Sequence, residues 1–239
     1  TVAYGALTGV PVYEGDRLVE IRPSNFVTGR ARIDGRRVVL GGDDFTVRGG
    51  AADGAIGYKA GYSERMALEL RLPIVRLVDG TGGGGSVKSL ETTRRTYVPA
   101  NPAMEIMTEL LSTVPVVAAA LGPVAGLGAA RVVFSHFSVM VKGSSQLFVA
   151  GPPIVRRGIG QDVDKETLGG SAIHTRLSGA VDNEVDREDE AFAQIRRFLS
   201  YLPASVHELP PVAECDDPPD RREEELLQIV PRSRRQPHD

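Results

Sequence analysis

Short apolar runs alternate along this chain with longer runs in which apolar residues recur at helical spacing. The runs that predict strands are 38–40, 74–78, 115–120, 137–141 and 146–149. The runs that predict helices are 60–72, 104–111 and 187–201. Strands that are apolar throughout are typical of sheets covered on both faces, and helices separate most of them here. The pattern therefore predicts an α/β fold with parallel strands.

The first part of the chain adds a turn and a further apolar segment to this pattern. Asp34 and Gly35 form a dipeptide that favours a tight turn, so we expect a hairpin around 33–36. Residues 45–47 continue the apolar run after 38–40, and we interpret them as the end of the same strand or as a second strand. Pro73 ends the first predicted helix just before strand 74–78.

Two glycine-rich segments, 77–87 and 121–130, carry the first indication of chemistry. Each follows an apolar run and precedes a helix-compatible run, so each predicts a strand that turns sharply into a helix. Glycine permits positive φ and close approach, and unpaired amides at a helix start favour negative charge. Two such corners could converge on one oxygen and stabilise an oxyanion without a catalytic side chain. Glycines that only allow tight packing remain the alternative.

Nucleotide-binding motifs do not explain the first corner. Residues 80–85 lack the GxGxxG opening of a first βαβ unit, and Lys88 and Ser89 lack the spacing of a P-loop.

Serine chemistry is a weaker hypothesis, because none of the candidate serines lies in a GxSxG elbow. His136 and His174 could act as the base, but we interpret both as structural histidines and keep catalysis as the alternative. The candidate nucleophiles are Ser86, Ser135 and Ser145.

The composition is that of a folded protein, with 41% hydrophobic and 25% charged residues among 239. A net charge of −3 argues against a nucleic-acid partner.

The lone Cys215 cannot form an intrachain disulfide, which favours a reducing, cytoplasmic compartment. We expect no metal, because the four histidines and the cysteine lack metal-ligand spacing and 43–44 fits a solvated strand end or turn. Pro123 and glycines interrupt the apolar stretch 114–133, so we expect no membrane span.

Both ends of the chain favour a domain cut out of a longer polypeptide. The chain begins at Thr1 without an initiator methionine and ends in a polar segment. After Pro203 the composition shifts to Pro-Pro pairs and mixed charge. This shift predicts an extended connector with one short helix at 223–229.

Motifs from residue 134 onward occur in the order used by one family. Segment 138–152 reads SVMVKGSSQLFVAGP and is similar to F-M-V-x-x-x-S-x-L-F-x-x-G-P. Segment 166–171 reads ETLGGS and is similar to E-x-L-G-G-A, and His174 with 178–179 matches the following H-x-x-x-S-G. Segment 212–221 is similar to that family's connector. The chain thus resembles the carboxyltransferase (beta) subunits of biotin-dependent acyl-CoA carboxylases, together with related decarboxylases and transcarboxylases.

The resemblance covers most of the chain and implies its organisation. It implies a ClpP/crotonase-like spiral of ββα units in residues 1–203, which is the N-terminal, acyl-CoA-binding half. It implies that 204–239 is a connector toward a C-terminal, biotin-binding half that this chain lacks. The implied partners are biotin carboxylase, biotin carboxyl carrier protein and the C-terminal half of another subunit in a homo-oligomer.

The implied reaction transfers a carboxyl group from carboxybiotin to the α-carbon of an acyl-CoA. An enolate would form, held in a backbone oxyanion hole, and biotin would be carried on a partner. The isolated half is expected to be inactive. Acyl-chain length and the direction of transfer stay open.

The resemblance assigns oxyanion residues by their place in two motifs. Gly126 and Leu127 stand at the Gly-Gly of A-G-G-A, which implies that their amides form one side of the hole, with Gly128 as a backup. The first corner matches D-S-G-G-A in more than one register. The alternatives for the second side are therefore Gly82, Gly83 and Gly84.

A third segment is similar to the family's CoA-binding region. Residues 45–51 match the part that cradles the adenine and the phosphates. Cationic side chains there are plausible phosphate partners, although ordinary surface cations are the alternative. The implied residues are Arg48, Gly49, Gly50, Ala51 and Lys59, with Gly128 nearby.

Two departures from the family keep other functions open. Leu127 replaces a glycine, which a backbone donor tolerates, and 179–182 read GAVD where the family often has G-V-A-H. One alternative is a crotonase-type acyl-CoA hydratase, isomerase or thioesterase, for which Glu91 would be an acidic side chain near the first corner. The other is a non-catalytic acyl-CoA-binding module.

Overall fold

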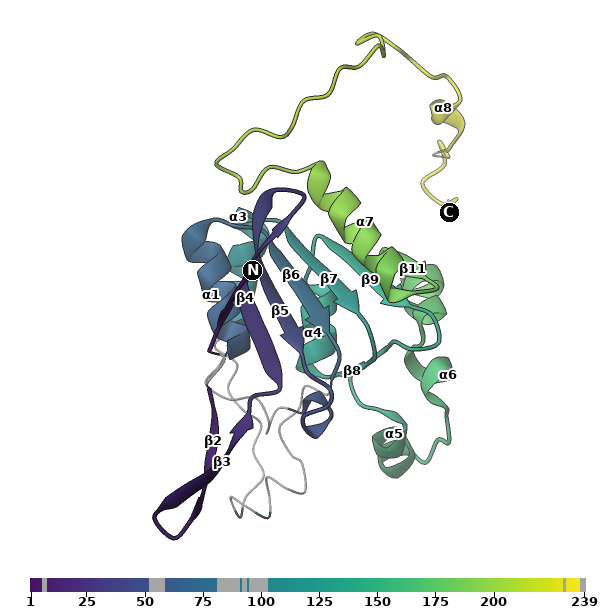
Figure 1. The fold of residues 1–239 in the computed structure, drawn as a ribbon. Helices are drawn as coiled ribbons and strands as arrows, with labels where there is room; N and C mark the ends of the chain where they lie inside the picture. The colour runs from purple at the N-terminus through teal and green to yellow at the C-terminus, as the bar shows by residue number, and fades with distance from the viewer. Residues whose placement is uncertain are drawn as a thin grey trace.

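A mixed seven-stranded sheet with helices on both faces forms the body of the chain (Figure 1). This computed structural model describes residues 1–5, 8–51, 59–80, 91, 94, 103–229 and 231–236. Pairing is antiparallel from the first strand to the third and parallel from the third to the last, so the predicted α/β fold is confirmed. The order is β1 (Val2–Tyr4), β4 (Phe26–Ile33), β5 (Arg36–Asp43), β6 (Ile74–Val78), β7 (Val116–Ala120), β9 (Phe137–Val141) and β11 (Asn183–Val185).

Strands β4 and β5 form the hairpin that the Asp-Gly dipeptide predicts. Ile33 pairs with Arg36 across the turn, and the two central residues have positive φ, 50° at Asp34 and 81° at Gly35. Positive φ at both positions is the geometry of a type I′ turn, whose twist matches that of the flanking strands. The hairpin prediction is therefore confirmed.

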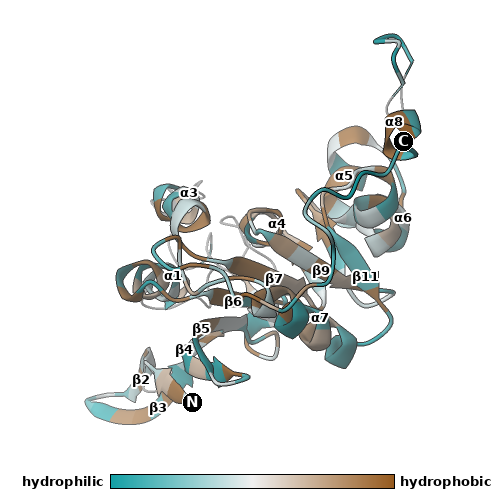
Figure 2. Cartoon of the chain, turned by 90° about the horizontal axis from the view of Figure 1, so that it is seen from above, coloured by the Kyte–Doolittle hydropathy of each residue, from teal (hydrophilic) through white to brown (hydrophobic). Residues whose placement is uncertain are grey.

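Successive residues of the central strands face opposite layers of helices. Val38 and Val117 lie in the core on one face, whereas Val39 and Val116 lie in the core on the other. Figure 2 shows α3 and α4 on one side of the sheet and α7 on the opposite side. The three longest predicted helices are confirmed within two residues at each end. The helices are α1 (Lys59–Leu70), α3 (Ala103–Thr113), α4 (Leu127–Val133) and α7 (Glu188–Ser200).

A strand, strand, helix order recurs through the middle of the chain. After β7 come β8 (Pro123–Ala125) and α4, and after β9 come β10 (Gln146–Phe148) and α5 (Pro152–Ile159). The short strands β8 and β10 pair in parallel outside the main sheet, with Val124 opposite Leu147. The pairing of these equivalent positions stacks one ββα unit on the next.

Residues 45–47 do not form the strand that their apolar character predicts. Asp44 closes a turn instead, because its Oδ1 accepts the Thr46 amide at 3.0 Å and its carbonyl accepts the Val47 amide at 3.2 Å. A short 3₁₀ turn, η1 (Arg48–Gly50), follows. The strand prediction was wrong because a side-chain acceptor captured the backbone donors that a ladder would need.

Several elements lie outside the predicted pattern. Strands β2 (Gly9–Glu14) and β3 (Arg17–Pro23) form a separate, mostly exposed hairpin. Helix α6 (Lys165–Gly169) and the π-helical turn η3 (Ile173–Leu177) follow α5. Beyond residue 208 almost every described residue is exposed, and Figure 1 shows an extended trace there that contains α8 (Leu226–Ile229), shorter than the predicted helix 223–229.

Candidate active site

The described beginning of the first glycine corner packs directly against η1. A Cβ added to Gly50 would lie 2.5 Å from the Cα of Gly80, and one added to Gly80 would lie 2.7 Å from the Cα of Gly50. Gly50 also has a φ of 65°. Only glycine allows two backbones to approach this closely. Three predicted oxyanion residues, Gly82, Gly83 and Gly84, lie outside the described residues.

The second glycine corner turns at Gly126, which has φ 61° and ψ −125° and precedes α4. Its amide donates to the Phe148 carbonyl at 2.9 Å, so this predicted donor is already paired within the fold. The amides of Leu127 and Gly128 follow at the start of α4, and neither donates to an acceptor among the described residues. Leu127 is 40% exposed. The next two amides, rather than that of Gly126, thus have no acceptor among the described residues, and of the two residues Leu127 is exposed and Gly128 is buried.

The described parts of the two corners touch each other. The Ala125 amide donates to the Gly80 carbonyl at 3.4 Å. A Cβ added to Gly128 would lie 2.8 Å from Val124 Cγ1 and 3.4 Å from the Gly80 carbonyl oxygen. Gly80 therefore lies between η1 and the second corner, so that the predicted CoA segment and both predicted corners meet at the carboxyl ends of β5, β6 and β7.

Strand β10 holds the second corner from the other side. Besides the bond to Phe148, the Gln146 amide donates to the Gly122 carbonyl at 3.4 Å. Nε2 of Gln146 in turn donates to Glu166 at the start of α6. The segments 138–152 and 166–171, which carry the sequence resemblance, thus pack on one another and support the glycine corner.

The predicted CoA-binding residues lie at the edge of this region. Arg48 and Gly49 both have φ of 60° within η1, and the carbonyl of Ala51 accepts Nδ2 of Asn25 at 2.7 Å. Lys59 begins α1, where its Nζ donates to the Gly5 carbonyl at 3.2 Å and burial lowers its pKa. The structure thus keeps Arg48 to Ala51 beside the first corner and gives Lys59 one backbone partner.

Two acidic residues that the sequence analysis did not select lie beneath the corners. Asp43 ends β5 and Asp79 follows β6, and Oδ2 of Asp43 accepts the Asp79 amide at 3.1 Å. Burial raises the pKa of Asp43, against the opposing effects of Arg131 and of the Asp79 amide. Burial also raises the pKa of Asp79, and the negative charges of Asp43 and Glu188 add to this. Asp43 therefore ends a strand, and Asp44 closes a turn, as the sequence predicts for 43–44, but Asp43 is partly buried rather than solvated.

Gly122 of the second corner makes room for this acidic pair. A Cβ at this position would overlap the carboxylate of Asp79. Together with Gly50, Gly80 and Gly128, it shows that several glycines around the corners have a packing role. Asp79 could have been found from the sequence, because it is the aspartate of the segment similar to D-S-G-G-A.

A buried charge cluster fixes the helix that follows the second corner. Oε1 of Glu64 lies 3.1 Å from Nη2 of Arg76 and 3.3 Å from Nε of Arg131. Arg76 is fully buried, and its Nη1 donates to the carbonyls of Arg131 and Phe134 at 2.9 and 2.6 Å. Burial lowers the pKa of Arg76 to about 10, although Glu64 opposes the shift. Arg76 therefore stays charged at neutral pH and joins α1, β6 and the end of α4.

The candidate histidines hold backbone groups. Nδ1 of His136 accepts the Val116 amide at 3.0 Å, so its proton lies on Nε2, which is 2.9 Å from the Leu111 carbonyl. Nε2 of His174 lies 2.9 Å from the Leu147 carbonyl, which accepts its proton. These contacts favour the structural interpretation of both residues.

Two of the candidate serines are likewise engaged with the backbone. Ser145 Oγ donates to the Val141 carbonyl at 2.8 Å, and Ser135 Oγ donates to that of Arg131 at 3.2 Å. Ser86 lies outside the described residues, whereas Glu91 is described and exposed.

Within the described ranges, no three metal-ligating side chains gather into a cluster. No helix among the same residues is long and apolar enough to cross a membrane.

Comparison with known proteins places these features in a family. The family model for the carboxyl transferase domain matches residues 14–239. The chain belongs to the carboxyl transferase domain family. The predicted family is therefore confirmed.

Two relatives show how much of a carboxyl transferase protein this chain represents. It is 34% identical over 232 residues to the mitochondrial propionyl-CoA carboxylase beta chain of Homo sapiens, covering 91% of this chain and 42% of that one. It is 31% identical over 225 residues to methylmalonyl-CoA decarboxylase subunit alpha of Veillonella parvula, covering 94% and 43%. The chain thus spans about two fifths of the length of these curated relatives.

Solved structures agree with the assignment to the carboxyl transferase family. A crystal structure of transcarboxylase 12S, a hexamer assembly with methylmalonyl-CoA bound, is similar with a TM-score of 0.74 and 27% identity. The similarity covers 96% of this chain and 44% of that one. The predicted ClpP/crotonase-like α/β fold is confirmed.

Proposed function

We propose that this chain is the acyl-CoA-binding part of a carboxyltransferase that transfers a carboxyl group from carboxybiotin to the α-carbon of an acyl-CoA. The observation that carries the proposal is the meeting of η1 and both glycine corners at Gly80 in a carboxyl transferase domain. Because the chain covers 42% of its human relative, catalysis would need the rest of such a polypeptide.

In this proposal the second corner binds the thioester oxygen of the acyl-CoA. The amides of Leu127 and Gly128 donate to that oxygen, and the bonds strengthen as removal of the α-proton places negative charge there. Gly126 acts differently from the sequence-based assignment. Its own amide pairs with Phe148, and its positive φ turns the two following amides toward the ligand. Gly82, Gly83 and Gly84 remain alternatives for the opposite side of the oxyanion hole.

The CoA moiety would lie along the segment from Arg48 to Ala51. The close approach of Gly50 to Gly80 supports this, because a ligand on η1 would be next to the first corner. Arg48 and Lys59 would hold phosphates, although Lys59 would have to share its ammonium group with the Gly5 carbonyl.

Biotin on a partner would supply the carboxyl group to this site and would take up the α-proton in exchange. Backbone amides fit an anionic oxygen and do not distinguish a ureido oxygen, so no residue of this chain is assigned to biotin. The partners proposed are biotin carboxylase, biotin carboxyl carrier protein and the C-terminal half of another subunit in a homo-oligomer. A cytoplasmic location fits the free, exposed Cys215.

A valine at Gly126 tests this assignment. The substitution places a branched side chain at positive φ beside the proposed donors, so carboxyl transfer to acetyl-CoA and propionyl-CoA should fall by about 10²–10³. The assay uses the complete polypeptide with its biotin carrier. The matched control is Gly15→Val, because Gly15 has φ 62° against 61° at Gly126 and a Cβ there meets nothing within 4 Å.

Two results would overturn the proposal. One is full carboxyl transfer by folded Gly126→Val protein. The other is hydration, isomerisation or hydrolysis of an acyl-CoA by the wild type without biotin, which would favour a crotonase-type enzyme. Binding of acyl-CoA without any of these reactions in the complete assembly would indicate a non-catalytic module.

A further inference from the structure

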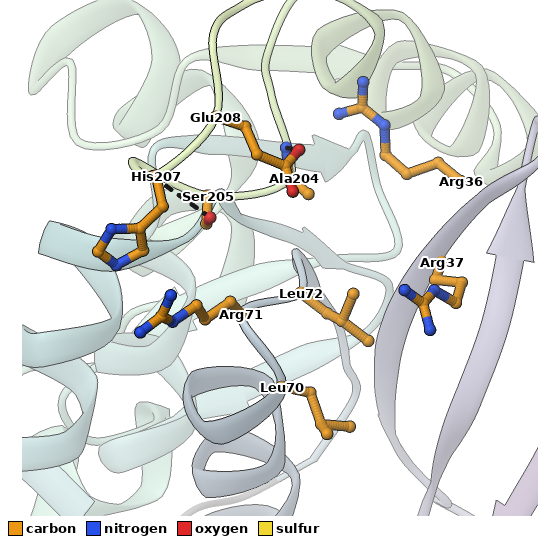
Figure 3. Close-up of a pocket in the computed structure, with 9 residues that line it drawn as sticks. All are labelled: Arg36, Arg37, Leu70, Arg71, Leu72, Ala204, Ser205, His207 and Glu208. Carbon is orange, nitrogen blue, oxygen red and sulfur yellow. Dashed lines mark hydrogen bonds between the residues drawn. The ribbon is translucent and has the colours of Figure 1, made fainter.

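A pocket at the opposite end of the sheet is formed by three segments that are far apart in sequence (Figure 3). Its lining comes from the beginning of β5, from the end of α1 with the residues after it, and from the segment after α7. The cavity measures about 430 Å³. Strand β5 runs from this pocket to Asp43 beneath the glycine corners, and its eight residues at roughly 3.3 Å each separate the two sites by about 25 Å.

Hydrogen bonds hold the segment that covers this pocket. Nη1 of Arg36 donates to the Pro203 carbonyl at 3.5 Å, and the Val206 amide donates to the Thr113 carbonyl at 3.0 Å. The Glu208 amide donates to the Ser205 carbonyl at 3.1 Å. The segment after α7 is therefore attached both to β5 and to the end of α3, so this wall of the pocket is a defined part of the fold.

Arg71 occupies a backbone position that glycine normally takes. The Leu72 amide donates to the Ala67 carbonyl at 3.0 Å and the Arg71 amide donates to the Leu68 carbonyl at 3.1 Å, which is the Schellman ending of a helix. Arg71 has a φ of 52° at the position where this motif prefers glycine. The backbone is strained at Arg71, and glycine at this position would relieve the strain. An arginine kept there, in the lining of a pocket, therefore indicates a role for its side chain.

The pocket has an excess of positive charge. Among the described residues, none of the three lining arginines, Arg36, Arg37 and Arg71, forms an ion pair with a carboxylate. Arg37 also stands opposite Arg32 across the hairpin, an arrangement of like charges that destabilises a sheet. One lining carboxylate, that of Glu208, accepts the Ala204 amide at 3.3 Å.

A buried hydroxyl adds a neutral donor to these cations. Ser205 is 2% exposed, and its Oγ accepts the His207 amide at 3.4 Å. Its hydroxyl hydrogen has no acceptor within the described parts of the chain. Figure 3 shows Arg37 and Arg71 on either side of Leu72, with Ser205 and Glu208 above them.

We propose that this pocket binds a small organic phosphate. The guanidinium group of Arg71 holds the phosphate, since a guanidinium matches phosphate oxygens in charge and geometry, and Arg37 adds positive charge from the other side of Leu72 (Figure 3). The Ser205 hydroxyl donates to it, and Leu70 and Leu72 contact the carbon skeleton. The site is about 25 Å from the glycine corners by the length of β5, so it is independent of the proposed carboxyl transfer.

Calorimetric titration of the purified protein with ribose 5-phosphate and with inorganic phosphate, at constant ionic strength, tests this inference. Ribose 5-phosphate should bind saturably and more tightly than inorganic phosphate. Arg71→Ala should weaken its binding by at least about tenfold, and Arg37→Ala should weaken it by a smaller factor because Arg37 acts from the other side of Leu72. The matched control is Arg65→Ala, which removes an exposed arginine of α1 outside the pocket lining and should leave binding unchanged.

Arg71→Gly separates a ligand-binding role from a structural one. It should raise the unfolding temperature, because glycine relieves the positive φ, and it should weaken ribose 5-phosphate binding as Arg71→Ala does. A lower unfolding temperature in Arg71→Gly would overturn the inference, because the side chain would then serve the fold. So would the absence of saturable binding, equal weakening by Arg65→Ala, or tighter binding of citrate, a carboxylate of similar charge.

Discussion

Two groups of arginines, one at the middle of α1 and one at its end, experience opposite environments. Arg76 and Arg131 are buried and share the carboxylate of Glu64, and Arg76 also donates to two carbonyl groups at the end of α4. The pocket arginines, of which Arg37 and Arg71 are exposed, have no carboxylate partner among the described residues. A buried guanidinium must be paired because its desolvation costs much free energy. An exposed guanidinium stays hydrated without a protein partner and is available to bind a ligand. The same residue type therefore serves the fold in one place and binding in the other.

The largest effect should come from the buried cluster. Arg76→Met should lower the free energy of unfolding by about 3–5 kcal/mol, because it breaks a buried ion pair and leaves the carbonyls of Arg131 and Phe134 without their donor. Denaturant unfolding measures the loss. Arg65→Met, on the exposed face of the same helix that carries Glu64, should stay within about 0.5 kcal/mol. Equal stability of Arg76→Met and the wild type would show that the cluster is not structural.

A smaller and pH-dependent effect should follow at Asp43, the neighbour of this cluster. The raised pKa of Asp43 means that the fold disfavours its charged form. Its contribution to stability is therefore present at low pH and is lost as pH rises from the ordinary carboxyl range through the raised pKa. Asp43→Asn removes this loss and keeps an acceptor for the Asp79 amide. The stability of the variant relative to wild type should thus increase from pH 4 to pH 7 in unfolding experiments.

An opposite slope would show that Arg131 dominates over burial at Asp43. The control is Asp16→Asn in the exposed β2–β3 turn, for which the difference from wild type should stay flat over the same range.

The smallest effect on stability should come from the pocket. Arg37→Ala removes an exposed cation that faces Arg32 across the hairpin, so the free energy of unfolding should change by less than about 0.5 kcal/mol and can increase. Thermal unfolding without phosphate measures this. A loss comparable to that of Arg76→Met would mean that the two groups of arginines do not differ in role.

Much of the architecture followed from local pattern. The apolar runs predicted the central strands and the three longest helices, and Asp34-Gly35 predicted the hairpin, because these features depend on residues close in sequence. Local pattern failed at 45–47, where the Asp44 side chain formed a turn. It also missed β8, since a strand of three residues carries little periodic signal, whereas β10 lies within the predicted strand 146–149.

The site was predictable only where a motif marked it. The glycine corners were located from spacing and resemblance, but the pairing of Gly126 with Phe148 shifts the proposed donor role to Leu127 and Gly128. This pairing joins β10 to the corner and leaves no local trace in the sequence. The contact of Asp79 with Asp43 depends likewise on the pairing of β5 with β6, because the two residues are 36 positions apart in the sequence.

By itself the sequence determined the alternation of strands and helices, the two glycine corners and the family to which the chain belongs. Tertiary structure decided which charges are buried and which stay open. Arg76 reaches Arg131 across 55 residues, and Arg36 reaches Pro203 across 167. The amino-acid composition does not distinguish these arginines from one another. Their roles differ because folding removes water from one group and leaves it around the other, and the strength of an ionic interaction depends on that water.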